Sequence, residues 1–231
     1  MALILSIETS TSVCSVALHD KGEVVAFLEE QKPNSHAAVL TVLIEKLLSD
    51  CKVPVEKLDA LAISSGPGSY TGLRIGVSVA KGICFALNKP LISVSTLQII
   101  AAHAISISNI SNDKTLICPM IDARRMEVYS ELYTTELNSF RSVDAEIITS
   151  ESFQSTLDER SIIFCGNGAQ KCQEVIQHKN AHFLPDIYAP AFMMGELAFK
   201  KYKKGEFEDV AYFEPFYLKS FVATTPKNSM F

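Results

Sequence analysis

"SSGPGSYTGLRIGVSVAKGICFAL", residues 64–87, runs from the end of a short apolar strand pattern through two glycines and a proline into a long apolar helix pattern. Glycines at such a junction let the backbone approach an anion at a helix N-terminus. The stretch differs from a Walker loop, because no G-K-[ST] follows, and from G-x-G-x-x-G, because Thr71 takes the place of the third glycine. Two interpretations stay open: a tight turn, or a phosphate contact made by Gly66 and Gly68 in an assembled state.

The helix expected at 70–88 has more apolar surface than a helix covering one side of a sheet needs. Its polar side chains gather in one arc of roughly 100° when residues are placed at about 100° intervals. Opposite that arc, Gly72, Gly76 and Ala80 form a stripe of small residues. We expect another helix to approach this stripe, so that replacing Gly76 by leucine abolishes partner binding while the chain still folds.

The helix expected at 34–50 is apolar over about half of its circumference. Two such helices on one face of a sheet suggest a partner protein. The alternative is that they pack only against each other and the sheet.

Residues 1–107 predict the element order βββαβαβα. Three leading strands form a meander, and the later strands return through helical crossovers, which gives a mixed sheet flanked by helices. The predicted strands are 2–8, 12–19, 23–30, 59–64 and 90–94, and the predicted helices are 34–50, 70–88 and 95–104.

Residues 108–231 start the same order again as a second, smaller lobe, after the polar stretch "SISNISNDK" at 106–114. The strand patterns are "TLICPMID", "RMEVYSELY", a segment near "DAEIIT", and "SIIFC". Helices are expected near "SESFQSTL", at 169–177 and at 190–204, the last packing back on the first lobe. The sequence therefore predicts an α/β protein of two lobes.

Glu8, Thr9 and Ser10 end the first predicted strand, where sheets of this kind present ligand-binding groups. A carboxylate at this place could hold a metal ion or activate a nucleophile. A hydroxyl-rich hairpin turn explains the same residues equally well.

Composition and short motifs argue against several classes of protein: nucleic-acid-binding, secreted, membrane-spanning and metal-binding proteins. The net charge of -5 argues weakly against nucleic-acid binding by this chain alone, and six cysteines without a C-x-x-C pair fit a reduced, cytoplasmic setting. The apolar N-terminus lacks the basic region of a signal peptide, and no apolar run is long enough to span a membrane. His178 and His182 come nearest to metal-ligand spacing, but the second lies past a predicted helix end, so we expect no metal site.

Three segments carry a family resemblance: "ILSIETSTSVCSVAL" (4–18), the glycine-loop helix (64–87) and "IDARRMEVYSELY" (121–133). Together they resemble the bacterial TsaB (YeaZ) family, and "FCGNGAQK" (164–171) and "EPFYLKSFVATTPK" (214–227) are compatible with it. The resemblance spans nearly the whole chain. It implies the actin/hexokinase/Hsp70-like (ASKHA) fold, with a ribonuclease H-like first lobe.

The resemblance also implies a role in forming N6-threonylcarbamoyladenosine next to the anticodon of tRNA, as a non-catalytic partner of the paralogue TsaD. The small ATPase TsaE would be a second partner, and tRNA would be bound only through the complex. Thr96 and Ile100 stand where the catalytic paralogue carries its H-x-x-x-H metal motif. We therefore expect no catalytic residue, no metal and no tightly bound cofactor, with ATP or ADP only in the assembled complex. Without its partner, the chain is expected to form a homodimer.

The family is thought to dimerise with its paralogue through the first two helices of the first lobe. The residues assigned here to that interface are His36, Leu40, Leu43, Leu47, Gly72, Ile75, Gly76, Val79 and Ala80. The candidates for vestigial nucleotide contacts are Glu8, Thr9, Ser10, Gly66, Gly68, Gly166 and Gly168.

Two enzymatic alternatives remain. A metalloprotease-like hydrolase would need the missing metal ligands. A small-molecule kinase of the same superfamily would need a catalytic carboxylate and two phosphate loops, which Glu8 and Gly166-Asn167-Gly168 could imitate.

Overall fold

The computed structural model describes residues 2–32, 35–108 and 114–219 as two mixed five-stranded sheets of identical topology. The first sheet has the order β3-β2-β1-β4-β5 and the second β10-β9-β6-β7-β8, so each starts with an antiparallel meander and adds two parallel strands. The strands of the first sheet are Leu3–Glu8, Cys14–Asp20, Glu23–Glu30, Ala60–Ser64 and Leu91–Val94 (β1 to β5). Those of the second are Thr115–Asp122, Glu127–Tyr133, Ser139–Ile147, Ser161–Cys165 and Ala181–Leu184 (β6 to β10).

The α-helices are α1 (His36–Asp50), α2 (Tyr70–Leu87), α3 (Thr96–Ile107), α4 (Gln154–Glu159) and α5 (Gly195–Lys204). Short 3-10 turns lie at Val55–Lys57, Gln170–Cys172 and Ala191–Met194 (η1 to η3). The first lobe has the predicted order βββαβαβα. Residue 34, with which the predicted first helix starts, lies outside the described residues, as does "TTPKNSMF" (224–231).

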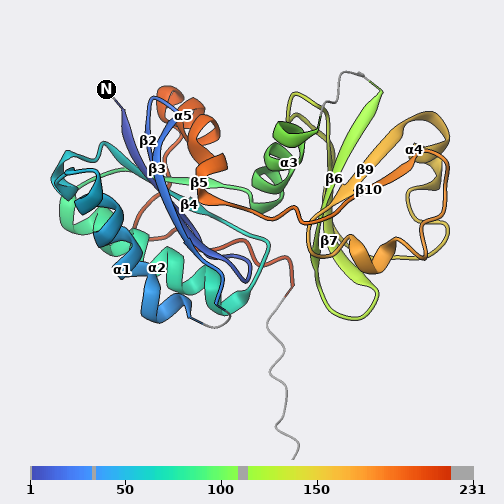
Figure 1. Cartoon of the computed structure of the whole chain (residues 1–231), viewed down its shortest axis with the longest axis horizontal. Coiled ribbons are helices and arrows are strands. Elements are labelled where there is room, and N and C mark those ends of the chain that lie inside the picture. The colour runs from blue at the N-terminus through green and yellow to red at the C-terminus, as the bar shows by residue number, and fades with distance from the viewer. Residues whose placement is uncertain (1, 33–34, 109–113, 220–231) are drawn as a thin grey trace, which may run out of the picture.

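Both faces of the first sheet are covered, which explains why its inner strands read as continuous apolar runs. Leu5 and Ile7 of β1 pack with α1 and α2 on one face, whereas Ile4 packs with α3 and α5 on the other. Figure 1 shows α1 and α2 on one side of this sheet and α5 on the opposite side. α5 therefore belongs spatially to the first lobe, although it follows the second sheet in the chain.

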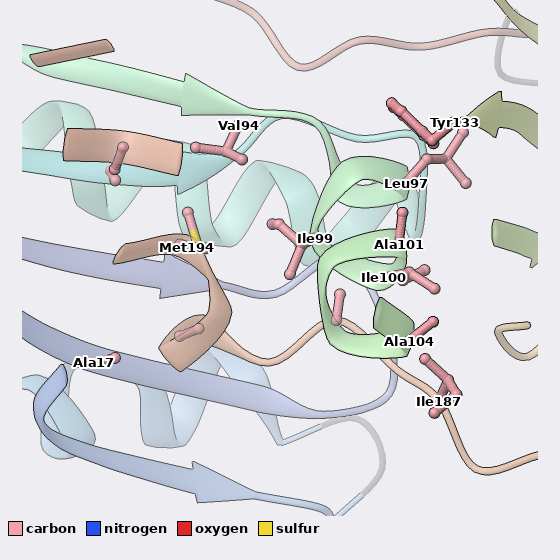
Figure 2. Close-up of a cluster of buried hydrophobic side chains, with 14 of the residues drawn as sticks. Ala17, Val94, Leu97, Ile99, Ile100, Ala101, Ala104, Tyr133, Ile187 and Met194 are labelled. Carbon is pink, nitrogen blue, oxygen red and sulfur yellow. The ribbon is translucent and has the colours of Figure 1, made fainter. Parts of the chain in front are cut away.

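The apolar helix α3 lies between the two lobes (Figure 1). It contacts β6, β7 and β9 of the second sheet, and its side chains share one core with Val94 and Met194 on the first-lobe side and Tyr133 on the other (Figure 2). A helix buried on nearly all sides needs apolar residues around its whole circumference. The lobes are thus joined by a common core as well as by chain connections.

The second half of the chain departs from the prediction in three places. Residues 169–177 form the turn η2 and a few further turn hydrogen bonds in place of a continuous helix, most of them i to i+3 and one, between Ile176 and Cys172, i to i+4. The strand β10 was not predicted. Ala169, Cys172 and Ile176 are buried at spacings of three and four residues, which resemble an α-helix, but consecutive single turns produce the same spacings. The helix predicted at 190–204 is split between η3 and α5.

Within the described ranges, no helix has the length and apolar content that crossing a membrane requires.

Candidate functional site

Glu8 is the last residue of β1, Thr9 and Ser10 follow it, and all three are buried. Oε1 of Glu8 accepts hydrogen bonds from the backbone N–H of Ser10, at 2.8 Å, and from the Ser10 hydroxyl. Among the described residues, Oε2 of Glu8, Oγ1 of Thr9 and Oγ of Ser64 have no hydrogen-bond partner. Burial raises the pKa of Glu8 to about 7, although the hydrogen bonds from Ser10 lower it. The result is a buried cluster of polar side chains under the glycine loop.

The glycine loop and the start of α2 pack directly on this buried polar cluster. The backbone N–H of Ser69 donates to the carbonyl oxygen of Ser10 at 2.7 Å, and the Ser69 hydroxyl caps α2 by accepting from the N–H of Gly72 at 3.2 Å. A Cβ on Gly68 would overlap Ser10, and one on Gly72 would overlap the carbonyl oxygen of Thr9. Because Gly68 and Gly72 have no side chain, the start of α2 can pack against the backbone of Thr9 and Ser10.

The small-residue stripe of α2 therefore faces the chain's own sheet. A Cβ on Gly76 would overlap Oγ1 of Thr9 and lie 3.0 Å from Cδ1 of Ile63. The prediction that another helix approaches this stripe is wrong, and Gly76→Leu would disturb the fold itself. The physical reason is that a small residue permits close approach of any element, and the nearest one is β1.

The loop is also covered from outside by the C-terminal strap, which we define as residues 206–219. Phe216 donates its N–H to the carbonyl oxygen of Ser65 at 2.7 Å, and a Cβ on Gly66 would lie 2.8 Å from the carbonyl oxygen of Phe216. Lys81 of α2 donates to the carbonyl oxygens of Ala211 and Phe213, both at 3.0 Å. Gly66 is thus buried under the backbone of the strap. This strap was not predicted, although the two pairs of adjacent aromatic residues in "YFEPFY" (212–217) are a signal for a segment that packs on the rest of the chain.

A cavity of about 350 Å³ lies between the glycine loop, the end of β5, the second sheet and the strap. Two carboxylates, of Glu131 and Glu214, line it. Carboxylates repel the phosphates of a nucleotide, so this cavity is poorly suited to hold one in the free chain.

Gly166 and Gly168 in the second lobe pack against β6. A Cβ on Gly166 would overlap the carbonyl oxygen of Met120, and Gly168 donates its N–H to the same oxygen at 3.0 Å. Asn167 accepts from the N–H of Asp122 at 3.0 Å. The loop at 166–168 therefore resembles the glycine loop of the first lobe, because in both loops the glycines allow close contact between two backbone segments.

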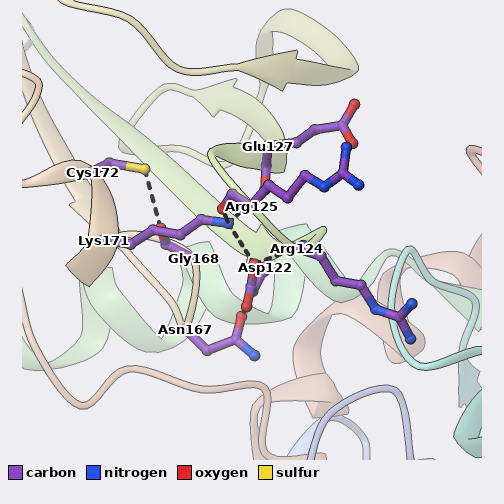
Figure 3. Close-up of polar contacts among 8 residues, drawn as sticks. All are labelled: Asp122, Arg124, Arg125, Glu127, Asn167, Gly168, Lys171 and Cys172. Atoms are coloured by element: carbon purple, nitrogen blue, oxygen red, sulfur yellow. Dashed lines mark hydrogen bonds and ion pairs between the residues drawn. The ribbon is translucent and has the colours of Figure 1, made fainter. Parts of the chain in front are cut away.

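Lys171, just beyond this loop, holds the β6–β7 turn in place (Figure 3). Its Nζ donates to the carboxylate of Asp122 and, at 2.7 Å each, to the carbonyl oxygens of Arg125 and Glu127. Desolvation raises the pKa of Asp122, but the hydrogen bonds from Lys171 and Arg124, together with the positive charges of both residues, hold that pKa below its ordinary value. Lys171 was not among the predicted site residues, because it belongs to no recognisable sequence motif.

Most of the residues predicted to form the partner interface are buried. Six of its nine residues lie inside the chain, because they face the sheet under α1 and α2, and cannot form an outer surface: His36, Leu40, Leu47, Gly72, Gly76 and Ala80. Leu43, Ile75 and Val79 are half-buried. An amphipathic pattern shows which residues share a helix face, but a helix with two apolar faces does not show which one turns inward.

The exposed apolar residues of this layer are different ones. Val42 on α1 is 58% exposed, and Phe85 on α2 is 85% exposed. Phe85 continues the polar arc of Arg74, Ser78 and Lys81 at helical spacing. An aromatic residue among polar ones is the signal that could have identified it.

Thr96 and Ile100, which the family resemblance assigns to the paralogue's metal motif, are buried in α3. Thr96 is 0% exposed and Ile100 is 1% exposed. Across residues 2–32, 35–108 and 114–219, no group of three or more His, Cys, Asp or Glu side chains could hold a metal ion. His178 and His182 do not act together: His178 pairs with Asp158 at 3.5 Å, and His182 is exposed.

Known proteins match this chain over most of its length. The family described as "TsaD: tRNA N6-adenosine threonylcarbamoyltransferase" matches residues 29–227. The tRNA threonylcarbamoyladenosine biosynthesis protein TsaB of Bacillus subtilis is 29% identical over 177 residues, 75% of each chain. The TsaB protein of Escherichia coli is 37% identical over 135 residues, 58% of this chain and 56% of that protein.

Solved structures give the same result. YeaZ from Pseudomonas aeruginosa superposes with a TM-score of 0.83 at 29% identity, covering 94% of this chain and all of that chain (100%). A ROK hexokinase from Thermus thermophilus, at 9% identity and a TM-score of 0.50, covers 88% of this chain and 100% of its own and shares the fold alone. The ASKHA fold is confirmed. The chain belongs to the family that the TsaD description covers, and within it to the TsaB (YeaZ) proteins.

Proposed function

We propose that this chain is a non-catalytic subunit of the assembly that forms N6-threonylcarbamoyladenosine in tRNA, and that it docks on and activates a TsaD-like catalytic paralogue. Its relatives are named as biosynthesis proteins of this nucleoside. The observation that carries the docking role is the apolar outer surface of the α1–α2 layer, on which Val42 and Phe85 are exposed.

The docking surface consists of the outward side of both helices. α1 and α2 cover the same face of the sheet and contact each other. Ile75, Val79 and Ile83 recur every four residues along α2, and all three are half-buried, so their outer edges remain available. An exposed apolar layer of this kind is typical of a protein–protein interface. The same surface pairs two copies of this chain when the paralogue is absent.

The non-catalytic role rests on α3 and on the covered glycine loop. Thr96 and Ile100 offer no imidazole for a metal ion at the positions of the paralogue's motif. The strap lies over Gly66, and the adjacent cavity carries Glu131 and Glu214. ATP or ADP therefore binds only in the assembled complex, where a TsaE-like ATPase also joins. The hydrolase and kinase alternatives find no supporting observation among the described residues.

The test is reconstituted threonylcarbamoyl transfer to tRNA by TsaD-like and TsaE-like partners of the same organism, with and without this chain. We expect transfer to depend on this chain and the chain alone to give none. Val42→Asp should abolish both co-elution with the paralogue and transfer. The matched control is Val25→Asp, because Val25 is a valine of similar exposure, 52%, that lies on β3 and not on α1 or α2. Full transfer without the chain would contradict the proposal, as would undiminished co-elution of Val42→Asp.

A further inference from the structure

The turn between β6 and β7 carries two exposed arginines, Arg124 and Arg125, whose backbones are both left-handed, with φ of 71° and 51°. Lys171 stabilises this turn through the carbonyl oxygens of Arg125 and Glu127. Figure 3 shows both arginine side chains extending away from Lys171, in different directions. The turn thus presents two guanidinium groups on a fixed backbone.

The local carboxylates are already paired with lysines. Asp122 forms an ion pair with Lys171, and Glu127 forms one with Lys219 of the strap. Among the described residues, neither Arg124 nor Arg125 forms an ion pair with a carboxylate. Positive charge is therefore in excess here, although the whole chain carries a net charge of -5.

The strap continues this charged region onto the first lobe. Two residues before Lys219, the ring of Tyr217 lies against the ring of Tyr70 on α2, with centroids 4.9 Å apart. The guanidinium of Arg74 lies 4.5 Å from the centroid of the Tyr70 ring. Both tyrosines are half-buried, so part of each ring is accessible. The ion pair between Lys219 and Glu127 links these residues to the β6–β7 turn. We call the whole set the tyrosine–arginine surface, composed of Tyr70, Arg74, Arg124, Arg125, Tyr217 and Lys219.

We propose that the tyrosine–arginine surface binds an unpaired loop of RNA. Arginine and lysine contact phosphates, and aromatic rings stack on bases that are not paired, which is the combination that single-stranded RNA requires. A duplex would offer phosphates to the cations but no free base to the tyrosines. The identity of the RNA, the anticodon loop of tRNA, rests on the proposed function above.

The test uses a fluorescein-labelled anticodon stem–loop RNA and fluorescence anisotropy over a range of salt concentrations. Binding is measured for the complex with the TsaD-like paralogue and, at low ionic strength, for this chain alone. The variants are the double substitution Arg124→Gln/Arg125→Gln and the single substitution Tyr217→Leu. The matched control is Lys203→Gln/Lys204→Gln, which removes two exposed charges at the end of α5.

Each phosphate contact contributes about 0.7 to the slope of log affinity against log salt for a single strand, so the double arginine variant should lower that slope by about 1.4. Tyr217→Leu should weaken binding about tenfold with an unchanged slope, because it removes stacking and no charge. The lysine control should bind like the unmodified chain.

An unchanged slope in the arginine variant would overturn the inference, and so would equal binding of an RNA duplex of the same length. Loss of co-elution with the paralogue, with RNA binding by the chain alone unaffected, would assign the surface to a protein contact instead. Failure of this inference can be distinguished from failure of the proposed function, because RNA binding by this chain alone is measured without any transfer reaction.

Discussion

Adding one methyl group at Gly76 tests how tightly α2 packs on the end of β1. A Cβ at this position would lie 3.0 Å from Cδ1 of Ile63 and 3.3 Å from Cβ of Thr9, and would overlap Oγ1 of Thr9. A Cβ on Gly82, in the same helix, would meet no atom within 4 Å. Gly76→Ala and Gly82→Ala therefore apply one chemical change to one helix in two different surroundings.

Both substitutions gain about 1 kcal/mol from the higher helix propensity of alanine. Gly76→Ala also forces a carbon atom into a filled core, which typically costs about 1–3 kcal/mol. The free energy of unfolding of Gly76→Ala should thus lie about 2 kcal/mol below that of Gly82→Ala. For a chain of this size, each kcal/mol corresponds to about 2–4 °C, so the unfolding midpoints should differ by about 4–8 °C.

Urea and thermal unfolding followed by circular dichroism measure this difference directly. Gly82→Ala should be more stable than the unmodified chain, and Gly76→Ala less stable than Gly82→Ala. Equal stability of the two variants would refute the assignment of Gly76 to the contact with β1, and would return its stripe to the outer surface of α2.

Three further outcomes follow from the structure. The pKa of Glu8 is about 7 in the folded chain and 4.5 ordinarily, so its contribution to stability is complete below pH 4.5 and is lost as the pH rises through 7, a change on the order of 3 kcal/mol. Glu8→Gln should remove that decline in urea titrations, and an equally steep decline in the variant would contradict the burial of this carboxyl. Phe213→Ala should lower the free energy of unfolding by about 1–3 kcal/mol, because Phe213 packs on the core under α2; Tyr212→Ala, at a residue 84% exposed, should leave it within about 0.5 kcal/mol, as urea denaturation can show. A thiol reagent should modify Cys51 first in the native chain, and simultaneous reaction of all six thiols would argue against the folded core. Burial raises the pKa of the thiols of Cys14, Cys84, Cys118, Cys165 and Cys172.

Local sequence patterns were sufficient to predict the order of elements in the first lobe. Alternating and continuous apolar runs mark the strands, and the pair Gly66 and Gly68 marks the junction at which β4 turns into α2, because both signals depend on residues near each other in the chain. The same signals failed at residues 169–177, where spacing alone does not separate an α-helix from successive 3-10 turns.

The sequence by itself determined the two-lobed α/β architecture and the positions of the glycine loops. Only the tertiary structure decided which face of α2 turns inward, and that Phe85 and Val42, in place of the glycine stripe, lie outside. It also decided that the strap covers Gly66 and brings Tyr217 to Tyr70. The physical reason is separation along the chain: helical periodicity reports neighbours three or four residues away, whereas these contacts join residues whose proximity depends on how both lobes pack.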